Sequence, residues 1–144
     1  MDRDDIDAIM RKARVCRLGL CDEGKPYVVP VCFGYDGGAL YFHSSPRGRK
    51  MDVLRGNPDV CFEVDVDVEL IPADEACGWS VRYRSVIGFG RAVAIDDPQE
   101  KREALTILMR QYADGEFVFS EDGLARAAVV RIEIDGITGK SSGY

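Results

Sequence analysis

The chain opens with apolar residues at helical spacing inside a polar segment. Ile6, Ile9 and Met10 recur three or four residues apart within residues 3–13. Carboxylates occupy the first turn of this segment, where they suit the positive end of a helix dipole. The pattern predicts a short amphipathic helix over residues 3–13.

Short apolar runs separated by turn residues follow. The runs 15–21, 27–35 and 39–43 are divided by Asp-Glu-Gly-Lys and Asp-Gly-Gly, which reverse a chain at low cost. They predict three strands of an antiparallel meander. Further strands are predicted over residues 60–64, 66–70, 80–95 and 128–134. Strands joined mostly by hairpins favour a mainly β fold with peripheral helices, a closed or split antiparallel barrel, over a βαβ sheet.

Two short motifs refine this picture. Gly88 and Gly90 interrupt the long strand and indicate a bend; they are not a dinucleotide loop, because no third glycine and no helix follow them. Asp97 and Pro98 open a helix as its N-cap and first residue, and Glu100 is placed for a capping box.

Length and composition then bound the function. The 144 residues fit a single domain, 1–144, and a formal net charge of −6 disfavours nucleic acid as a partner. No run of about 18 apolar residues could span a membrane, and the acidic start is unlike a signal segment. We therefore expect a cytoplasmic protein without a membrane contact.

The cysteines, the single histidine and the acidic residues of the chain do not indicate a metal site or a reactive thiol. The five cysteines form no C-x-x-C pair and only one histidine is present, so no metal site is expected. The cysteines are expected to be reduced and mostly buried, with Cys77 beside Gly78 the most accessible. Asp65, Asp67 and Glu69 alternate, which is typical of the solvent face of a strand and only rarely of a metal patch.

The segment after residue 44 runs from a strand directly into a helix. Ser45 can cap this helix, Pro46 suits its first position, and Gly56 followed by Pro58 ends it. The sequence therefore predicts a helix whose N-terminus lies at the end of a strand.

Three cations, Arg47, Arg49 and Lys50, fall in the first turn and a half of that helix. The helix dipole disfavours cations there, so an anion such as a phosphate would offset them. The alternative is that these side chains are solvated and form only weak surface ion pairs. The residues alone leave both interpretations open.

Eight short stretches, spread from about residue 14 to residue 140, share their order and spacing with one known family. They are GKPYVVPV (24–31), GY (34–35), LYFHS (40–44), GRK (48–50), NP (57–58), VCFE (60–63), RYRSVIGFG (82–90) and ITGK (137–140). Together they resemble the FMN-binding split-barrel family of pyridoxamine 5′-phosphate oxidase, and within it the nitroimidazole-resistance (Nim-type) branch.

The resemblance implies a six-stranded antiparallel split barrel that forms a homodimer with two FMN molecules at the subunit interface. It implies that one strand runs along the isoalloxazine ring, that the next strand and the following helix hold the phosphate, and that the partner's long strand completes the pocket. The implied cofactor-binding residues are Val29, Pro30, Val31, Cys32, His43, Ser44, Arg49, Lys50, Trp79, Tyr83 and Ser85.

The function implied is flavin-dependent reduction of a small planar acceptor, such as a nitroaromatic compound, with His43 as the catalytic proton donor. His43 could instead only hydrogen-bond a loop, and Trp79 and Tyr83 could serve packing alone. FAD, a deazaflavin or haem are alternative cofactors, and a non-catalytic flavin or haem carrier or sensor is the alternative function. The oxidase's arginine-rich ending is missing, so oxidation of pyridoxamine phosphate is not expected.

Overall fold

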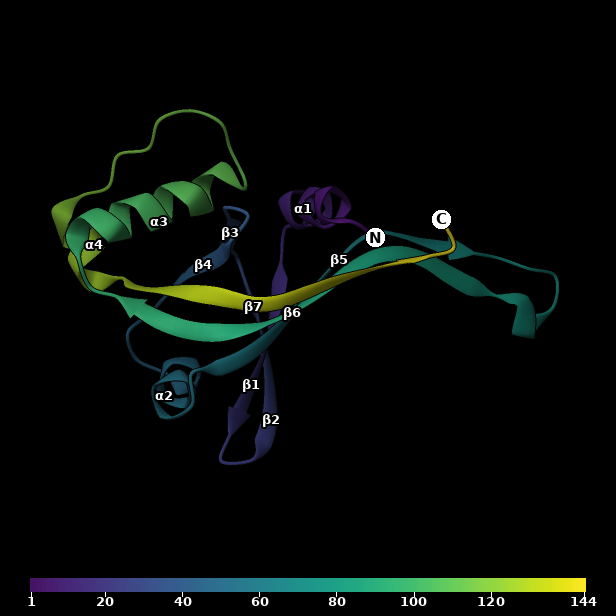
Figure 1. Cartoon of the computed structure of the whole chain (residues 1–144), viewed down its shortest axis with the longest axis horizontal. Coiled ribbons are helices and arrows are strands. Elements are labelled where there is room, and N and C mark those ends of the chain that lie inside the picture. Colours follow the sequence, from purple (N-terminus) through teal and green to yellow (C-terminus); the bar gives the residue numbers. More distant parts are fainter.

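A computed structural model describes residues 1–144 and shows one antiparallel sheet with helices at its margins (Figure 1). The strands are β1 (Cys16–Asp22), β2 (Lys25–Val31), β3 (Gly34–Tyr35), β4 (Ala39–Ser44), β5 (Asp59–Ile71), β6 (Ser80–Ile95) and β7 (Ala128–Ser142). The helices are α1 (Arg3–Lys12), α2 (Arg49–Gly56), α3 (Pro98–Arg110), α4 (Glu121–Arg126) and the 3₁₀ turn η1 (Ala76–Gly78).

The strand order is β2-β1-β5-β6-β7-β4-β3, so β2 and β3 are the two edges of the sheet. The long strands β5, β6 and β7 run side by side through the molecule, and the β5–β6 hairpin projects beyond the rest as an arm (Figure 1). Helices α3 and α4 lie at the opposite end. The fold is mainly β and its sheet is antiparallel, as predicted.

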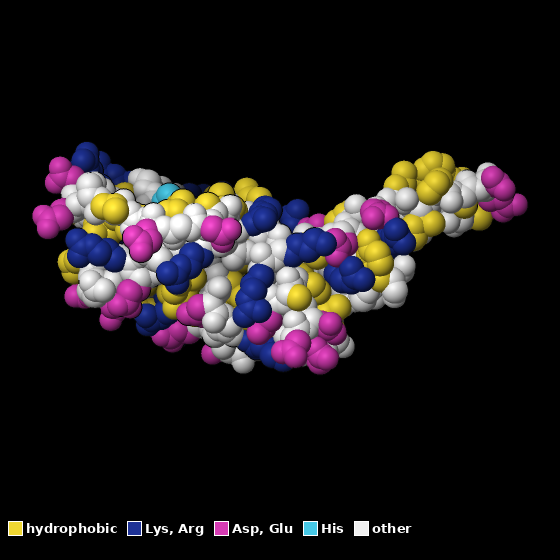
Figure 2. All heavy atoms as spheres, turned by 90° about the horizontal axis from the view of Figure 1, so that it is seen from above, with side chains coloured by type: hydrophobic (Ala, Val, Ile, Leu, Met, Phe, Trp, Pro, Cys, Tyr) yellow, Lys and Arg dark blue, Asp and Glu magenta, His cyan; other side chains and the backbone are white.

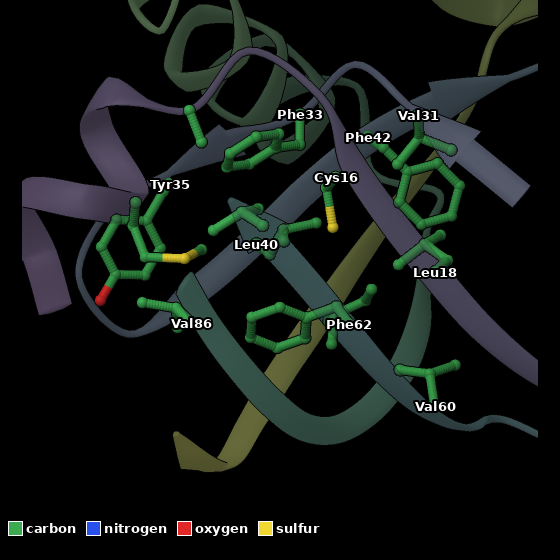
Figure 3. Packing of buried hydrophobic residues seen from close by; sticks show 14 of the residues in the cluster. Cys16, Leu18, Val31, Phe33, Tyr35, Leu40, Phe42, Val60, Phe62 and Val86 are labelled. Atoms are coloured by element: carbon green, nitrogen blue, oxygen red, sulfur yellow. The ribbon is translucent and has the colours of Figure 1, made fainter. Parts of the chain in front are cut away.

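The sheet curves around a core to which every strand contributes. Phe33, Phe42 and Phe62 are its largest fully buried side chains, and Met10 of α1 joins them. Figure 3 shows Phe42 beside Leu18 and Phe62 near Val86 in this cluster. Because the buried faces of the strands point inward, the sheet forms a barrel with a split between its edges.

Gly88 and Gly90 let β6 bend as the sequence predicts. A Cβ atom on Gly88 would lie 2.1 Å from Cζ of Phe62, and one on Gly90 would lie 2.2 Å from the Glu133 carbonyl oxygen. The pairing of β6 with β7 shifts register between Phe89 and Gly90. These glycines therefore provide close approach as well as a bulge.

Several predicted boundaries were wrong. The run 27–35 is two strands, because the chain leaves β1 after Val31 and Gly34 then packs directly against the backbone of Leu108. The runs 60–64 and 66–70 are one strand, because a bulge at Asp67 keeps β5 paired with β6. The last strand continues to Ser142, α4 was not predicted, and the sheet has seven strands where six were implied.

The cysteines follow the prediction only in part. Cys16 is buried, and burial raises the pKa of its thiol to about 12. Cys77 is exposed as expected, but Cys32 is exposed too, because it follows the last residue of an edge strand. None of the helices is both long enough and apolar enough to cross a membrane.

Gly90→Ala is expected to lower the free energy of unfolding by about 2 kcal/mol or more, because the new methyl group meets a backbone carbonyl that cannot move aside. Chemical denaturation followed by circular dichroism measures this. Gly56→Ala, at a helical position with open space around it, is the matched control and is expected to leave stability unchanged or raise it by up to about 1 kcal/mol. Equal losses in both variants would contradict the close-approach argument.

Candidate functional site

The helix that follows β4 begins three residues later than predicted. Its N-cap is Gly48, with a φ of 119°, and no side chain caps it. Ser45 and Pro46 therefore lie in the loop before the helix, where the Ser45 hydroxyl accepts a hydrogen bond from the Arg47 N–H at 3.3 Å. The prediction that Ser45 caps the helix was wrong, because a glycine with positive φ turns the chain instead. The first backbone N–H groups of α2 consequently have no side-chain acceptor.

Two cations remain in the first turn of α2, and each contacts a different strand. The Arg49 guanidinium lies 4.3 Å from the ring centre of Tyr27 on β2, and Lys50 Nζ lies 5.4 Å from the ring centre of Phe42 on β4. Arg49 also pairs with Asp22 at 3.3 Å. The first turn of α2 therefore bridges β2 and β4, two strands that do not hydrogen-bond to each other.

Lys50 has no acidic partner. It is half-buried, and burial alone lowers the pKa of its ammonium group. Most other cations near α2 are neutralised: Arg49 pairs with Asp22, and Arg55 pairs with Asp52 at 3.2 Å. A partly desolvated cation without a counter-charge, beside free N–H groups, is suited to receive an anion.

The loop before α2 is fixed by an arginine that the sequence analysis missed. Arg55, in the last turn of α2, donates a hydrogen bond to the Pro46 carbonyl at 2.7 Å. This bond ties the loop 45–48 back onto the helix that it precedes. Arg55 therefore helps to hold the loop that leads into α2, and no sequence pattern signals a contact between residues nine apart across a loop.

Strand β2 offers main-chain groups at the open side of the split. Pro26 pairs with Cys21 and Pro30 pairs with Arg17, and proline has no N–H to donate to β1. These positions must therefore turn their backbone groups toward the free edge, as Val28 does between them. The edge presents the N–H of Val28 and the carbonyl groups of Pro26, Val28 and Pro30.

The register divides the predicted stretch 29–32. Val29 and Val31 pair with Leu18 and Cys16, so their backbone groups face β1, and their side chains pack toward the core. Pro30 and Cys32 are exposed. Of the predicted residues on β2, Pro30 is therefore the one whose carbonyl group faces the open edge, and Val28 joins it; Cys32 lies beyond the end of the strand.

Strand β4 has a second open edge. Its neighbour β3 pairs only with Leu40 and Tyr41, so the segment from Phe42 to Ser44 has no strand on that side. Phe42 is buried in the core next to Lys50, and Ser44 lies on the same face of β4. The open edges of β2 and β4, with the first turn of α2, form what we call the split site.

The His43 side chain points away from Arg49 and Lys50. Because side chains alternate along a strand, His43 lies on the opposite face of β4 from Phe42 and Ser44. There it lines a groove together with residues of α3 and α4. Only the backbone of His43 belongs to the split site of the same chain.

The three residues predicted to come from the partner's long strand lie on the arm or near its base. Trp79 follows η1 and is 51 % exposed, Tyr83 is half-buried with Lys140 Nζ 5.6 Å from its ring centre, and Ser85 is buried. No hydrogen bond, ion pair or cation–π contact joins them to Arg49 or Lys50. One chain therefore brings together the residues near α2 and keeps the residues on β6 apart from them.

The sequence was compared with known proteins. A family model described as pyridoxamine 5′-phosphate oxidase matches residues 2–141. An uncharacterized protein of Rhizobium meliloti (strain 1021) is 33 % identical over 64 residues, which are 44 % of this chain. That match spans 42 % of the relative's own length.

Two solved structures resemble the whole chain. A candidate 5-nitroimidazole antibiotic resistance protein from Bacteroides thetaiotaomicron is 37 % identical, with a TM-score of 0.87 over 96 % of this chain and 82 % of that one. The flavocytochrome Anf3 from Azotobacter vinelandii is 26 % identical, with a TM-score of 0.85 over 99 % of this chain and 68 % of that one. The split-barrel fold implied by the resemblance is therefore confirmed.

Lys50→Met is expected not to lower the free energy of unfolding of the ligand-free protein, and to raise it slightly, because the charge is desolvated and unpaired. The gain should shrink as pH rises from the lowered pKa of Lys50 toward 10.5, since the wild-type charge is then lost in the folded and later in the unfolded chain. Urea denaturation at several pH values measures both.

Lys101→Met is the matched control. Lys101 is also half-buried, but it donates hydrogen bonds to the carbonyl groups of Leu124 and Ala127, each at 3.0 Å. Its loss is expected to cost about 1–3 kcal/mol. A similar destabilisation by Lys50→Met would show that Lys50 serves the fold and is not reserved for a ligand.

Proposed function

The chain belongs to the pyridoxamine 5′-phosphate oxidase family, and on that basis we propose that it binds FMN in the split site and passes electrons from the flavin to a small planar acceptor. Three features support this proposal in turn: the cations of α2, the free edge of β2 and the position of His43. We also propose that it acts in the cytoplasm, where its five free thiols would stay reduced.

The observation that carries the proposal is the unpaired charge of Lys50 next to Arg49 at the start of α2. A phosphate there would accept hydrogen bonds from the free N–H groups of the helix, and it would neutralise Lys50. Arg49 would exchange its exposed pair with Asp22 for a contact with the phosphate. Inorganic anions fit the same features, so the remaining part of the ligand must be argued from the edge of β2.

The free edge of β2 suits the pyrimidine edge of a flavin ring. That ring edge carries one N–H donor flanked by carbonyl acceptors, and Val28 offers one donor and one acceptor toward the split. Pro30 adds an acceptor and, lacking an N–H, leaves this edge with few donors. Main-chain recognition of this kind depends on register and therefore survives changes in side chains.

When bound, the flavin supplies the electrons, and the chain's own residues supply position and protons. His43 is the proposed proton donor to the reduced acceptor, because it is the single histidine of the chain and imidazole is a common proton donor in enzymes. Tyr41, on the same face, does not compete: burial and its hydrogen bond to Asp36 raise its pKa to about 12.

We propose further that two copies of the chain form a homodimer through the arm. Apolar side chains that the chain itself leaves uncovered gather there, as Figure 2 shows for the projecting end of the molecule. They are Val68 (57 % exposed), Leu70 (61 %), Ile71 (38 %), Trp79 (51 %) and Val81 (41 %). A projecting hairpin with this surface needs a partner to cover it, and a second copy would bring Trp79, Tyr83 and Ser85 to the first copy's site.

A non-catalytic carrier of flavin or haem is the second candidate. The similarity to a flavocytochrome favours it, and His43 could serve as a haem ligand. Turnover separates the two candidates: after loading with FMN, a reductase is expected to be bleached by a nicotinamide donor and reoxidised by a nitroimidazole. Flavin that is bound but neither reduced nor reoxidised in this absorbance assay would favour the carrier.

The double variant Arg49→Ala/Lys50→Ala is expected to weaken FMN binding by about two orders of magnitude or more, because it removes two charge-assisted contacts. Titration of the ligand-free protein, followed by quenching of flavin fluorescence, measures the affinity. Arg47→Ala is the matched control: it lies one residue before the N-cap, is exposed, and should change the affinity little. Unchanged affinity in the double variant would place the phosphate elsewhere.

The double variant Leu70→Ser/Trp79→Ser is expected to convert the dimer to a monomer, because both apolar side chains lie on the arm. Light scattering after size-exclusion chromatography measures the molar mass. Val118→Ser is the control: this side chain is 97 % exposed but lies between α3 and α4, at the other end of the molecule (Figure 1). A wild-type monomer would leave the proposed partner residues without a role.

A further inference from the structure

The base of the arm is held by one carboxylate that bridges two elements of the barrel. The pairing of β5 with β6 shifts register between Val66 and Glu69, and Asp67 lies in this bulge with a φ of 56°. One carboxylate oxygen of Asp67 accepts a hydrogen bond from Lys12, the last residue of α1, and the other accepts one from Arg84 of β6 at 2.8 Å. The same side chain therefore ties the bulge to a helix and to the neighbouring strand.

Tyr144 contributes to the same junction. Its hydroxyl donates a hydrogen bond to the Asp67 carbonyl oxygen at 2.6 Å. Its ring centre lies 4.0 Å from the guanidinium group of Arg84 and 4.7 Å from that of Arg82. Arg82 in turn pairs with Glu69 on the arm. Contacts therefore run from α1 through Asp67 and Tyr144 to the arm, beside which the end labelled C lies in Figure 1.

The arm depends on this junction for its direction. Strand β7 pairs with β6 no farther than Tyr83, so beyond that point the hairpin has only its own two strands. Such a hairpin has no sheet to fix its orientation, and a bulge bends the strand that contains it. The arm from Asp67 to Ile71 is about 13 Å long, so a tilt of about 20° at its base would move its tip by about 5 Å. A displacement of this size would break a side-chain contact made at the tip.

We propose that Asp67 is a positioning residue: by bridging α1 and β6, its carboxylate sets the direction of the arm and so places Trp79 in the split site of a second copy. Trp79 directly precedes the last pair of the arm, Ser80 with Ile71, and is 51 % exposed. The proposal rests on the homodimer and the flavin function proposed above, and it names the contact that would make the arm of one copy fit the site of the other.

Asp67→Asn tests the bridge without straining the backbone. Asparagine, like aspartate, adopts positive φ more readily than most residues, so the bulge can keep its conformation. Its carboxamide carries no charge and has one acceptor oxygen where the carboxylate has two, so it cannot form the same ionic bridge. Lys12→Met removes the bridge from its other end, at a side chain that is 61 % exposed, and should act in the same direction with a smaller effect.

Asp7→Asn is the matched control. This carboxylate also joins α1 to a strand, because it accepts a hydrogen bond from the Tyr35 hydroxyl of β3 at 2.6 Å and pairs with Arg3 at 3.0 Å. It has no contact with the arm. A merely structural role of such a bridge would therefore give Asp7→Asn and Asp67→Asn the same effects.

The fluorescence of Trp79 reports on the arm alone, because Trp79 is the only tryptophan of the chain. In the FMN-free wild type, the side chain is expected to be protected from acrylamide, a quencher that reaches exposed tryptophan. Asp67→Asn should lose this protection, and Asp7→Asn should keep it. Because Trp79 would then no longer contact the flavin, Asp67→Asn should also weaken FMN binding by about threefold or more, whereas Asp7→Asn should not.

The two measurements separate this proposal from the flavin function. Wild-type Trp79 that is fully accessible to acrylamide, equal protection in the wild type and Asp67→Asn, or an equal loss in Asp7→Asn would each overturn the role of Asp67. FMN bound equally by the wild type and Asp67→Asn would overturn the placement of Trp79 in the split site. FMN bound by neither would refute the flavin function, while the acrylamide comparison would still decide whether Asp67 directs the arm.

Discussion

The sheet is open between its edge strands β2 and β3, where the end of β4 is also uncovered, and the proposed chemistry depends on this gap. In a closed barrel the backbone N–H and carbonyl groups of the two edge strands would hydrogen-bond to each other. Here β3 is two residues long and covers only part of β4, while Pro26 and Pro30 leave Val28 as the main-chain donor on the free side of β2. Main-chain groups that would otherwise hold the barrel together are therefore available to a ligand. The first turn of α2 contacts Tyr27 of β2 and Phe42 of β4, through Arg49 and Lys50.

This gap also explains why a cation is kept at some cost in stability. Lys50 lies against Phe42, a fully buried core residue, so its ammonium group loses hydration that no carboxylate replaces. Arg49, farther from the core, keeps an exposed partner. The two neighbours thus differ in how they would bind an anion. Arg49 would exchange the Asp22 carboxylate for the anion, whereas Lys50 would gain its first counter-ion. Gly48 and Arg55 are what hold the pair at this point, since one turns the loop and the other ties it to the helix.

The sequence identified the elements with strong local signals and missed those set by distant contacts. The N-cap at Asp97 was confirmed because its side chain bonds a backbone group three residues away. Ser45 carries the same type of signal, yet Gly48 takes the position, because its positive φ turns the chain into α2; Arg55 of the helix then bonds to the Pro46 carbonyl of the loop. In the candidate site, the grouping of Arg49 and Lys50 followed from spacing along one helix. Their contacts with Tyr27 and Phe42 depend on how the sheet folds, which no local pattern encodes.

The alternation of side chains along β4 sets a limit on what a single chain can do. Ser44 and Phe42 face the same side as the cations, whereas His43 faces α3 and α4. The proposed proton donor and the helix turn proposed to bind phosphate lie on opposite faces of one strand. They cannot both surround a small ligand, but they can flank a long ligand that crosses the open edge of the strand. They can also belong to sites completed by different copies of the chain, since the arm of a second copy would add side chains that the first lacks. In either case a ligand can reach both faces of β4 only along its open edge, which is three residues long, because no strand covers β4 there.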